Sequence, residues 1–283
     1  MKKILITGSS GYIGSHLLKK LKKRFEIFCL DKNEPTVATG EFHCVDIRNI
    51  RSLQNFRDTD EVDRGEEYDT VIHLAAEVMV GASTKDPILY YETNVLGTLN
   101  ILRSIRTKNF IFASTGAAEG LASPYGLSKK VGEEVVKQFC EQNNIDYTIF
   151  RFYNVIGSDG IEVKNTDGLF YNLLKSKKTG IFKIFGNDYN TPDGTCIRDY
   201  VHVYEVCEAI VKAINKPSFS IECLGHGNGH SVLEIVNKFI DVNKIEVRID
   251  FTDRREGDIE YSVLKDVSPY MKKIYQIEDL LKS

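Results

Sequence analysis

The sequence predicts an α/β fold, in which helices pack on both faces of a parallel sheet. Three observations support this prediction. Short apolar runs alternate with longer amphipathic stretches through the first half of the chain. A glycine-rich turn joins the first apolar run directly to the first amphipathic stretch. Hydrophobic residues make up 42% of the 283 residues and charged residues 27%, so the chain can bury a sizeable core and is not disordered.

The elements of the first half are expected in strict alternation. The predicted strands lie at residues 3–7, 26–30, 41–45, 70–74, 110–113 and 147–152. Apolar residues recur every three or four positions between them, which predicts helices that start at Tyr12 and lie at roughly 49–57, 87–106 and 124–142. Parallel strands need such crossover helices, so the expected sheet is parallel and doubly wound.

The regular alternation of predicted strands and helices ends after about residue 157. The stretch 158–195 is rich in Gly, Asn, Asp and Lys, and helical patterns lie near 168–178, 199–215 and 231–241. Doubly wound sheets bind ligands at the carboxyl ends of their strands, so a second lobe interleaved with the sheet is expected to cover that site. The predicted division is a sheet domain of residues 1–157, to which 195–215 return, and a smaller lobe of residues 158–194 and 216–283.

Charge and cysteine content limit the class of protein. The net charge of −3 gives no electrostatic support for a nucleic-acid or membrane-surface role. The six cysteines form no Cys-x-x-Cys pair. An even count would allow disulfides, but Cys29 and Cys44 lie in apolar, strand-like runs, which favours free buried thiols. No apolar run approaches the roughly 20 residues of a membrane span or the core of a signal peptide, so a cytoplasmic location is expected.

The first chemical motif is the turn GSSGYIG, which follows the first predicted strand. Gly8 permits the tight turn, Gly11 leaves the backbone open to a pyrophosphate, and Gly14 lets helix and strand pack closely. The helix N-terminus, where Tyr12 and Ile13 lie, offers free N–H groups and the positive end of a dipole to the anion. A purely structural turn is the alternative. The position between a strand and a helix favours a Rossmann dinucleotide-binding domain.

Acidic residues at strand ends favour NAD as the dinucleotide. Asp31 ends the second predicted strand, where an acid accepts hydrogen bonds from both adenosine ribose hydroxyls and repels a 2′-phosphate. Lys32 follows directly and tempers the preference over NADP. Asp46, before Ile47, ends the third strand and is placed to bind the adenine amino group; as an alternative, it caps the next helix.

The second motif is a tyrosine and a lysine on one face of a predicted helix. Tyr125 and Lys129 lie four residues apart, and an ammonium beside a phenol lowers the phenol's pKa, which suits a general base. Ser123 and Pro124 predict the helix start. Thr115 ends the strand before it and is expected near Tyr125. The same spacing occurs twice more, at Tyr171/Lys175 and Tyr261/Lys265, but those pairs lack such a neighbour.

Together these motifs resemble the extended short-chain dehydrogenase/reductase family. The segments of the first half that carry the resemblance are the glycine turn, Asp31, Asp46-Ile47, His73-Leu74-Ala75-Ala76, Asn94-Val95, Ser114-Thr115 and the Tyr125/Lys129 pair. In the second half, the segments similar to UDP-glucose 4-epimerases and their close relatives are Arg151–Asn154, Ile184–Tyr189, Asp193–Thr195, Arg198–Val203 and Arg255–Asp258. The resemblance runs from Lys3 to about Asp266.

The resemblance implies roles for individual residues. Besides the three glycines, those implied to bind NAD are Tyr12, Ile13, Asp31, Lys32, Asp46, Ile47, Leu74, Ala75, Ala76, Asn94, Tyr125, Lys129 and Tyr153. Thr115 and Tyr125 are implied to flank the C4 hydroxyl of a sugar, with Lys129 as the third catalytic residue. Those implied to hold the nucleotide diphosphate are Asn154, Phe185, Arg198, Arg255 and Asp258. Two arginines suit a diphosphate by forked hydrogen bonds, with surface ion pairs as the alternative.

The implied function is that of an isomerase in carbohydrate metabolism, which epimerises a UDP-hexose at C4 through a transient 4-keto sugar and holds NAD tightly. UDP-glucose and UDP-galactose are the expected pair. Ser262, at the position that faces the sugar's C2 group, would also admit an N-acetylated pair. The alternatives are a uronate, dTDP-sugar or GDP-sugar epimerase, a reductase that releases NADH, and a non-enzymatic NAD-binding regulator. A homodimer without a metal ion is expected.

Some positions depart from the family pattern. Relatives that dehydrate or decarboxylate sugars carry acids just after the hydroxyl residue, where this chain has Gly116 and Ala117, which favours simple epimerisation. Glu119 stands where epimerases usually have tyrosine. Val78 replaces a lysine, and Thr166 an asparagine, of other members. His73 and His202 are expected to be structural residues, not catalysts.

Overall fold

The chain forms two compact units, one of residues 1–151 with 207–222 and one of residues 152–206 with 223–283. The computed structural model describes residues 1–21, 23–37, 40–59, 67–120, 123–157, 160–161, 163, 165–255 and 257–282. Every helix in these ranges is too short or too polar to span a bilayer. Residues 152–157 and 195–206, which the sequence assigns to the sheet domain, belong instead to the second unit, and residues 216–222, assigned to the smaller lobe, belong to the first.

A seven-stranded sheet with the order β10-β6-β5-β4-β1-β2-β3 is built mainly by the first unit. Its strands are β1 (Lys3–Thr7), β2 (Glu26–Asp31), β3 (Glu41–Cys44), β4 (Thr70–His73), β5 (Asn109–Thr115), β6 (Asp146–Phe152) and β10 (Ile221–Leu224). The pairs β1–β2, β1–β4, β2–β3 and β4–β5 are parallel. The six predicted strands and the parallel sheet are therefore confirmed.

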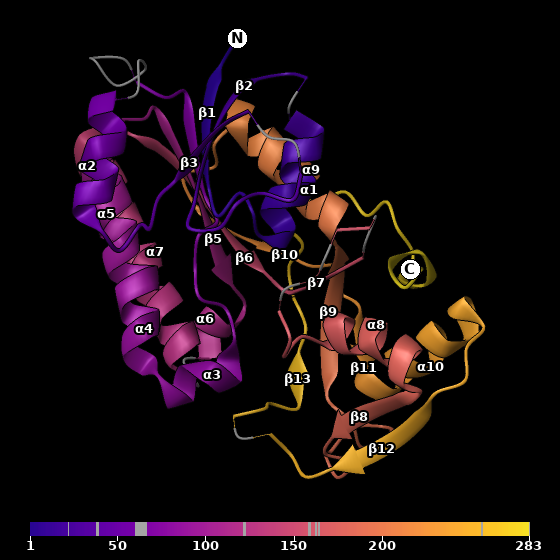
Figure 1. Cartoon of the computed structure of the whole chain (residues 1–283). Helices are drawn as coiled ribbons and strands as arrows, with labels where there is room; N and C mark the ends of the chain where they lie inside the picture. The colour runs from indigo at the N-terminus through magenta and orange to yellow at the C-terminus, as the bar shows by residue number, and fades with distance from the viewer. Residues whose placement is uncertain are drawn as a thin grey trace. The chain divides into compact units, whose positions relative to one another are not determined.

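Helices cover both faces of this sheet. On these faces lie α1 (Tyr12–Leu21), α2 (Ile50–Thr59), α7 (Pro124–Asn143) and α9 (Val203–Asn215). The short helices α3 (Val80–Lys85) and α6 (Ala117–Gly120) pack against α7. Figure 1 shows α2 and α7 on one side of the strands and α1 and α9 on the other. The core of the unit includes Leu5, Phe28, Val71 and Phe110 from the strands and Val136 from α7, all with less than 5% of their surface exposed. The doubly wound arrangement thus follows from the alternation of strands and helices in the sequence.

The helix predicted at 87–106 consists of three successive segments. They are α4 (Pro87–Tyr91), the π-helical turn η1 (Glu92–Leu96) and α5 (Gly97–Ser104). Asp86 caps the start, because its Oδ1 accepts a hydrogen bond from Leu89 N at 3.2 Å. A π-helical turn inserts an extra residue into the ladder and is frequent at functional sites. Here the turn contains Asn94, whose side chain is fully buried.

The second unit contains two smaller sheets. In the four-stranded one, β9 (Ile197–His202) pairs with β11 (Gly229–Ser231), β13 (Tyr261–Ser262) and β7 (Asn154–Ile156). The two-stranded one joins β8 (Ile181–Phe185) to β12 (Arg248–Thr252) in parallel. The helices are α8 (Leu169–Thr179), α10 (Val232–Asn243) and α11 (Ile277–Leu280). Of the predicted stretch 158–194, residues 158–159, 162 and 164 lie outside the described residues.

Two expectations about local structure are wrong in part. The helix predicted from residue 199 begins only at Val203, because residues 197–202 form β9 and pair with three other strands. All six cysteines are free, as predicted, but they are not all buried. Cys44 is exposed because it ends β3, the edge strand of the sheet, and Cys223 is only partly buried.

Candidate active site

The glycine turn forms a cradle at the carboxyl end of β1. Gly8 has φ +73°, and a Cβ there would lie 2.6 Å from Ala75 N, while a Cβ on Gly14 would lie 2.4 Å from Gly8 O. The fold itself therefore requires these two glycines. A Cβ on Gly11 would meet only Gly8 O, at 3.1 Å, so the chain's own packing constrains this position less. An open backbone at Gly11, at the start of α1, fits the close approach of a dinucleotide pyrophosphate.

The segment after β4 borders this turn. Leu74 N donates to Thr7 O at 3.0 Å, and Ala75 N donates to Thr7 Oγ1 at 3.3 Å, so Leu74, Ala75 and Ala76 leave the sheet beside β1. His73 is buried and bridges Thr7 Oγ1 at 2.7 Å and Thr98 Oγ1 at 3.0 Å. Burial lowers the pKa of His73 to about 3, so it stays neutral. Its predicted structural role is confirmed.

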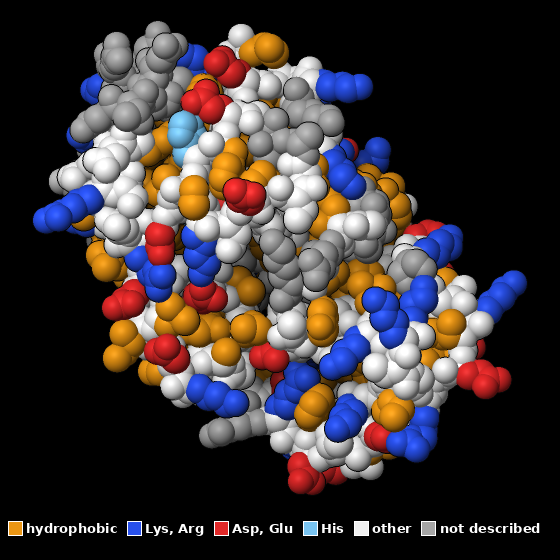
Figure 2. Space-filling model, in the orientation of Figure 1, with side chains coloured by type: hydrophobic (Ala, Val, Ile, Leu, Met, Phe, Trp, Pro, Cys, Tyr) orange, Lys and Arg blue, Asp and Glu red, His pale blue; other side chains and the backbone are white. Residues whose placement is uncertain are grey.

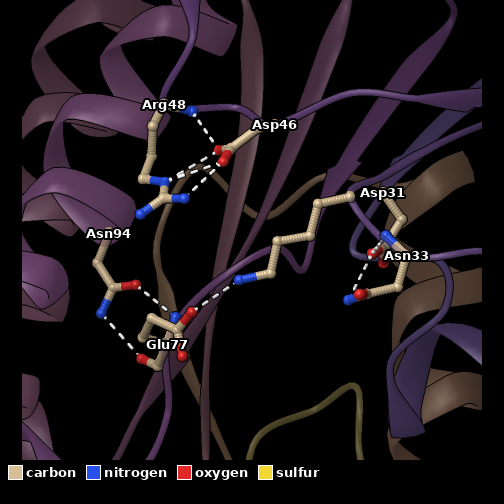
Figure 3. A network of polar contacts seen from close by, with 7 residues as sticks. Asp31, Asn33, Asp46, Arg48, Glu77 and Asn94 are labelled. Carbon is tan, nitrogen blue, oxygen red and sulfur yellow. Dashed lines mark hydrogen bonds and ion pairs between the residues drawn. The ribbon is translucent and has the colours of Figure 1, made fainter.

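Asp31 ends β2 next to the glycine turn. Its Oδ2 accepts from Ser10 N at 3.0 Å and its Oδ1 from Asn33 N at 2.9 Å. Oδ1 also accepts a longer hydrogen bond from Asn33 Nδ2 at 3.5 Å, whereas Oδ2 retains a second lone pair, which leaves acceptor capacity for a ribose hydroxyl. Lys32 forms an ion pair with Glu77, with Nζ 3.0 Å from Glu77 Oε1 (Figure 3). Asp31 and Lys32 are adjacent in sequence but thus bind different partners.

Asp46 and Arg48 form an ion pair at the start of the segment between β3 and α2 (Figure 3). Arg48 Nη2 donates to Asp46 Oδ2 at 2.6 Å, and Nε lies 3.1 Å from both oxygens. These hydrogen bonds lower the pKa of Asp46. The alternative role of Asp46 as a helix cap is wrong, because Asn49 Oδ1 accepts from the backbone of Arg51 and Ser52 at the start of α2. A hollow beside the pair is lined by Asp46, Arg48, Asn49, Ile50, Arg51, Glu92 and Leu96.

Tyr125 lies in the first turn of α7. Ser123 caps this helix, since its Oγ accepts from Gly126 N at 3.1 Å, and Pro124 occupies the first turn. Thr115, at the end of β5, lies close enough to Tyr125 for its hydroxyl to lower the pKa of the tyrosine. The ring of Tyr90 packs edge-on against Tyr125, with 6.2 Å between centroids. The predicted meeting of Thr115 and Tyr125 is therefore present in the first unit.

Lys129 lies one turn further along α7 and is almost fully buried. Its Nζ is 4.1 Å from the centre of the Phe112 ring. Burial lowers the pKa of Lys129 to about 7. Burial also raises the pKa of Tyr125 to about 12, although the hydrogen bond to Thr115 acts in the opposite direction. The expected lowering of the tyrosine pKa by the lysine is thus wrong for this arrangement, because desolvation is the larger effect.

A buried ion pair that the sequence analysis missed lies beneath these residues. Glu133, fully buried on α7, accepts from Arg151 Nε at 2.8 Å and Nη2 at 2.7 Å. It also accepts from Ser114 Oγ at 2.6 Å, the residue before Thr115. Arg151 Nη1 donates to Glu119 Oε1 at 2.8 Å, so the glutamate that replaces the usual tyrosine is bound to the same arginine. The position of Glu133 four residues after Lys129 was the available signal, since both lie on one helix face.

The two rival pairs have different surroundings. Tyr171 and Lys175 lie on α8, and Lys175 is exposed. Tyr261 belongs to the strand β13 and is 53% exposed, so Tyr261 and Lys265 do not share a helix face. Of the three tyrosine–lysine pairs, Tyr125/Lys129 alone combines a helix start with a hydroxyl partner and a buried lysine.

The residues predicted to hold a nucleotide diphosphate belong to the second unit. Arg198, on β9, has Nη2 3.5 Å from Asp258 Oδ1, and Asp258 N donates to Arg255 O at 3.2 Å. The Arg255 guanidinium lies over the Phe185 ring, 3.9 Å from its centre. These four residues are thus neighbours within one unit, and Arg198 and Asp258 do form the ion pair considered as an alternative.

The remaining predicted residues of this unit lie along β9. Ser262, on β13, is in register with Arg198. Asn154, on β7, donates through Nδ2 to Asp199 O at 2.9 Å, and Tyr153 precedes it and is partly buried. His202 stacks on the Tyr275 ring at 4.1 Å between centroids, which agrees with its predicted structural role. No cluster of metal-ligating side chains occurs among the residues that the structure describes.

Comparison with known proteins gives the class of this chain. The model of the NAD dependent epimerase/dehydratase family matches residues 4–222, and the chain belongs to this family. The UDP-glucose 4-epimerase of Rhizobium meliloti is 32% identical over 90% of this chain and 86% of that protein. The crystal structure of UDP-glucose 4-epimerase from Brucella ovis with NAD has a TM-score of 0.87 at 26% identity, over 99% of this chain and 96% of the other.

A further solved relative acts on two kinds of sugar. The UDP-Glc/GlcNAc 4-epimerase of Campylobacter jejuni is 26% identical, with a TM-score of 0.78, over 98% of this chain and 96% of that one. Together with the family match, these similarities identify the chain as a nucleotide-sugar 4-epimerase, an isomerase whose cofactor is NAD.

Proposed function

We propose that this enzyme interconverts UDP-glucose and UDP-galactose through a 4-keto sugar. The observation that carries the proposal is the position of Tyr125 at the start of α7, close to Thr115 and one helical turn from the buried Lys129. When bound, NAD accepts the hydride from C4 of the sugar and returns it to the opposite face. The protein's own task is to move one proton to and from the 4-hydroxyl and to hold the sugar while it turns.

Tyr125 is the proposed acid and base for this proton. Tyr125, as the phenolate, removes the proton from the C4 hydroxyl as the ketone forms and becomes the phenol, which returns the proton when the hydride comes back. Thr115, which lies near enough to lower the pKa of Tyr125, is proposed to orient the two groups. Burial leaves Tyr125 with a pKa of about 12 and Lys129 with a pKa of about 7. The positive charge of a bound nicotinamide would favour the phenolate, because an opposite charge stabilises the ionised form.

Residues 116 and 117 favour epimerisation over dehydration. Gly116 and Ala117 have no acidic group that could protonate a leaving hydroxyl. The nearby Glu119 points to Arg151, with Oε1 2.8 Å from Nη1. Dehydration is therefore the less supported reaction.

The second unit is proposed to bind the nucleotide diphosphate. Arg198 and Arg255 supply two guanidinium groups, and Phe185 supports Arg255 from one side. Asp258 is proposed to hold Arg198 in place. The contact of 3.5 Å between Arg198 and Asp258 is at the weak limit of a hydrogen bond. Arg198 Nη2 is therefore proposed to donate to a bound diphosphate.

An assay that separates epimerase from reductase tests this function. Purified enzyme given UDP-glucose alone should form UDP-galactose without net NADH, measured by absorbance and by chromatography of the sugars. A stoichiometric rise of NADH would support the reductase alternative. A panel of UDP-, dTDP- and GDP-sugars, including uronates, should show the highest kcat/KM for the UDP-hexoses. A higher value for any other class would reject the proposed substrate.

Ser262 is proposed to let the enzyme accept UDP-GlcNAc and UDP-GalNAc as well. It lies in register with Arg198, and a small side chain there leaves room for an acetamido group. Ser262→Tyr should lower kcat/KM for the N-acetylated pair by about 10- to 200-fold and leave the other pair nearly unchanged, because steric exclusion is selective. Equal losses on both pairs, or no initial activity on the N-acetylated pair, would contradict this.

A homodimer is proposed from an exposed apolar surface on the first unit. Its residues lie on α4, η1, α5 and α7 and are Ile88, Tyr91, Leu96, Leu99 and Leu127. Figure 2 shows hydrophobic side chains at the surface in the region where Figure 1 places α4. Such a patch marks interfaces on soluble proteins. Light scattering should give twice the chain mass for the natural protein and a monomer for Leu99→Glu; a monomeric natural protein would contradict the proposal.

The cytoplasmic location stays a prediction.

A further inference from the structure

The Lys32–Glu77 ion pair crosses the end of β1. Lys32 directly follows β2, and Glu77 comes four residues after the end of β4. These two strands flank β1 on its two sides. The ion pair, at 3.0 Å, therefore joins the two neighbours of the strand that leads into the glycine turn (Figure 3). The Lys32 side chain is 49% exposed and that of Glu77 23%.

The backbone of Glu77 is fixed by hydrogen bonds to the buried side chain of Asn94. Its backbone N donates to Asn94 Oδ1 at 2.9 Å, and its backbone O accepts from Asn94 Nδ2 at 3.0 Å. Asn94 is fully buried, and its Nδ2 also donates to Ser128 Oγ on α7 at 2.9 Å. The π-helical turn and α7 therefore fix the backbone of Glu77, whereas Lys32 is a long, flexible side chain at a strand end.

Lys32 stands where a cation would change the choice of dinucleotide. It follows Asp31, the residue proposed to meet the adenosine ribose, and NADP differs from NAD only by a phosphate on that ribose. A cation beside the ribose attracts a 2′-phosphate through charge-assisted hydrogen bonds. Arg48, the other cation of this network, is bound by Asp46.

We propose that Glu77 is a positioning residue for cofactor choice, which binds Lys32 away from the ribose and so keeps the site selective for NAD over NADP. The selectivity then has two parts. Asp31 repels the 2′-phosphate, and Glu77 occupies Lys32, a neighbouring cation that would attract it. The inference rests on the NAD site and on the proposed role of Asp31, and it is independent of which sugar the enzyme uses.

The test measures which dinucleotide the protein carries. The natural protein and Glu77→Gln are expressed in the same host, purified whole and denatured, and the released NAD(H) and NADP(H) are quantified. Glutamine keeps the size of the side chain but not its charge. The ratio of NADP to NAD should rise about two- to fivefold in Glu77→Gln, the range expected when one partly exposed ion pair is released.

Two controls separate release of Lys32 from simple loss of a negative charge. In the Lys32→Met background, Glu77→Gln should change the ratio by less than about twofold, because no lysine is released. Glu92→Gln, which removes the same charge from the neighbouring hollow, should also leave the ratio within about twofold of that of the natural protein.

Three results would overturn the inference. An equal rise with and without Lys32 would show that the charge of Glu77 acts directly. An unchanged ratio in Glu77→Gln, in a protein that still carries NAD, would show that Lys32 is not part of cofactor choice, and the NAD site would stand. A natural protein that carries no dinucleotide, or NADP alone, would overturn the proposed role of Asp31 as well.

Discussion

Two buried carboxylates, Glu133 of the first unit and Asp199 of the second, are stabilised in different ways. In the first, Glu133 binds the guanidinium of Arg151, directly below Thr115 and Lys129. In the second, Asp199 is equally buried but accepts from three backbone N–H groups, those of His226, Gly227 and Leu264. A charged side-chain pair supports the reactive residues of one unit, whereas a single carboxylate ties together distant chain segments in the other. Replacing Glu133 or Asp199 with its uncharged amide should therefore lower the free energy of unfolding by different amounts.

The largest expected effect is on the reaction and comes from the residue above the Glu133 pair. Tyr125→Phe should lower kcat by about 10²- to 10⁴-fold, because a positioned general base is lost while the ring packing against Tyr90 remains. Released NAD should stay at the level of the natural protein. Tyr171→Phe, in the second unit, is the matched control and should be mild. Near-normal turnover of Tyr125→Phe would show that the assignment is wrong.

The next effect is on stability in the first unit. Glu133→Gln should cost about 3–5 kcal/mol, because it leaves the buried charge of Arg151 without its main partner. Urea unfolding followed by fluorescence measures the loss. Glu119→Gln removes the exposed partner of the same arginine and should cost no more than about 1 kcal/mol. Equal costs for the two variants would contradict the assignment of Glu133 as the principal counter-ion.

A feature can be predicted from the sequence when the residues that form it lie close together along the chain. The parallel sheet follows from alternating strands and helices, and Tyr125 was found because Ser123, Pro124 and Lys129 all lie within six residues of the same helix start. By contrast, Lys32 and Glu77 are 45 positions apart, and only the sheet order brings them together. The error at β9 has a similar cause, because an apolar run that continues into α9 shows its strand partners only in the folded chain.

A smaller stability effect is expected in the second unit. Asp199→Asn keeps the shape of the side chain but replaces one accepting oxygen with an amide, so about 1–3 kcal/mol should be lost. Hydrogen exchange should rise at the amides of Gly227 and Leu264 and not in the first unit. Asp188→Asn, at an exposed acid of the same unit, is the control and should leave exchange unchanged. A uniform rise across both units would contradict a local role.

The smallest effect is a difference in acid stability. Burial alone would raise the pKa of Glu133, but the hydrogen bonds from Arg151 and Ser114 hold it below its usual value of 4.5. The unfolded chain then binds more protons as the pH falls, so this stabilisation is present above about pH 4.5 and is lost below it. Glu133→Gln lacks this group, and its unfolding free energy should depend less steeply on pH between about 5 and 3. Identical slopes would contradict a lowered pKa.

The fate of the hydrogen at C4 tests the central claim most directly. The natural enzyme is given UDP-glucose that carries deuterium at C4, in ordinary water, and the UDP-galactose formed is analysed by mass spectrometry and NMR. The account predicts that the product keeps the deuterium at C4, because the hydride leaves to NAD and returns without exchange with solvent. UDP-galactose with ordinary hydrogen at C4, or no UDP-galactose at all, would contradict it.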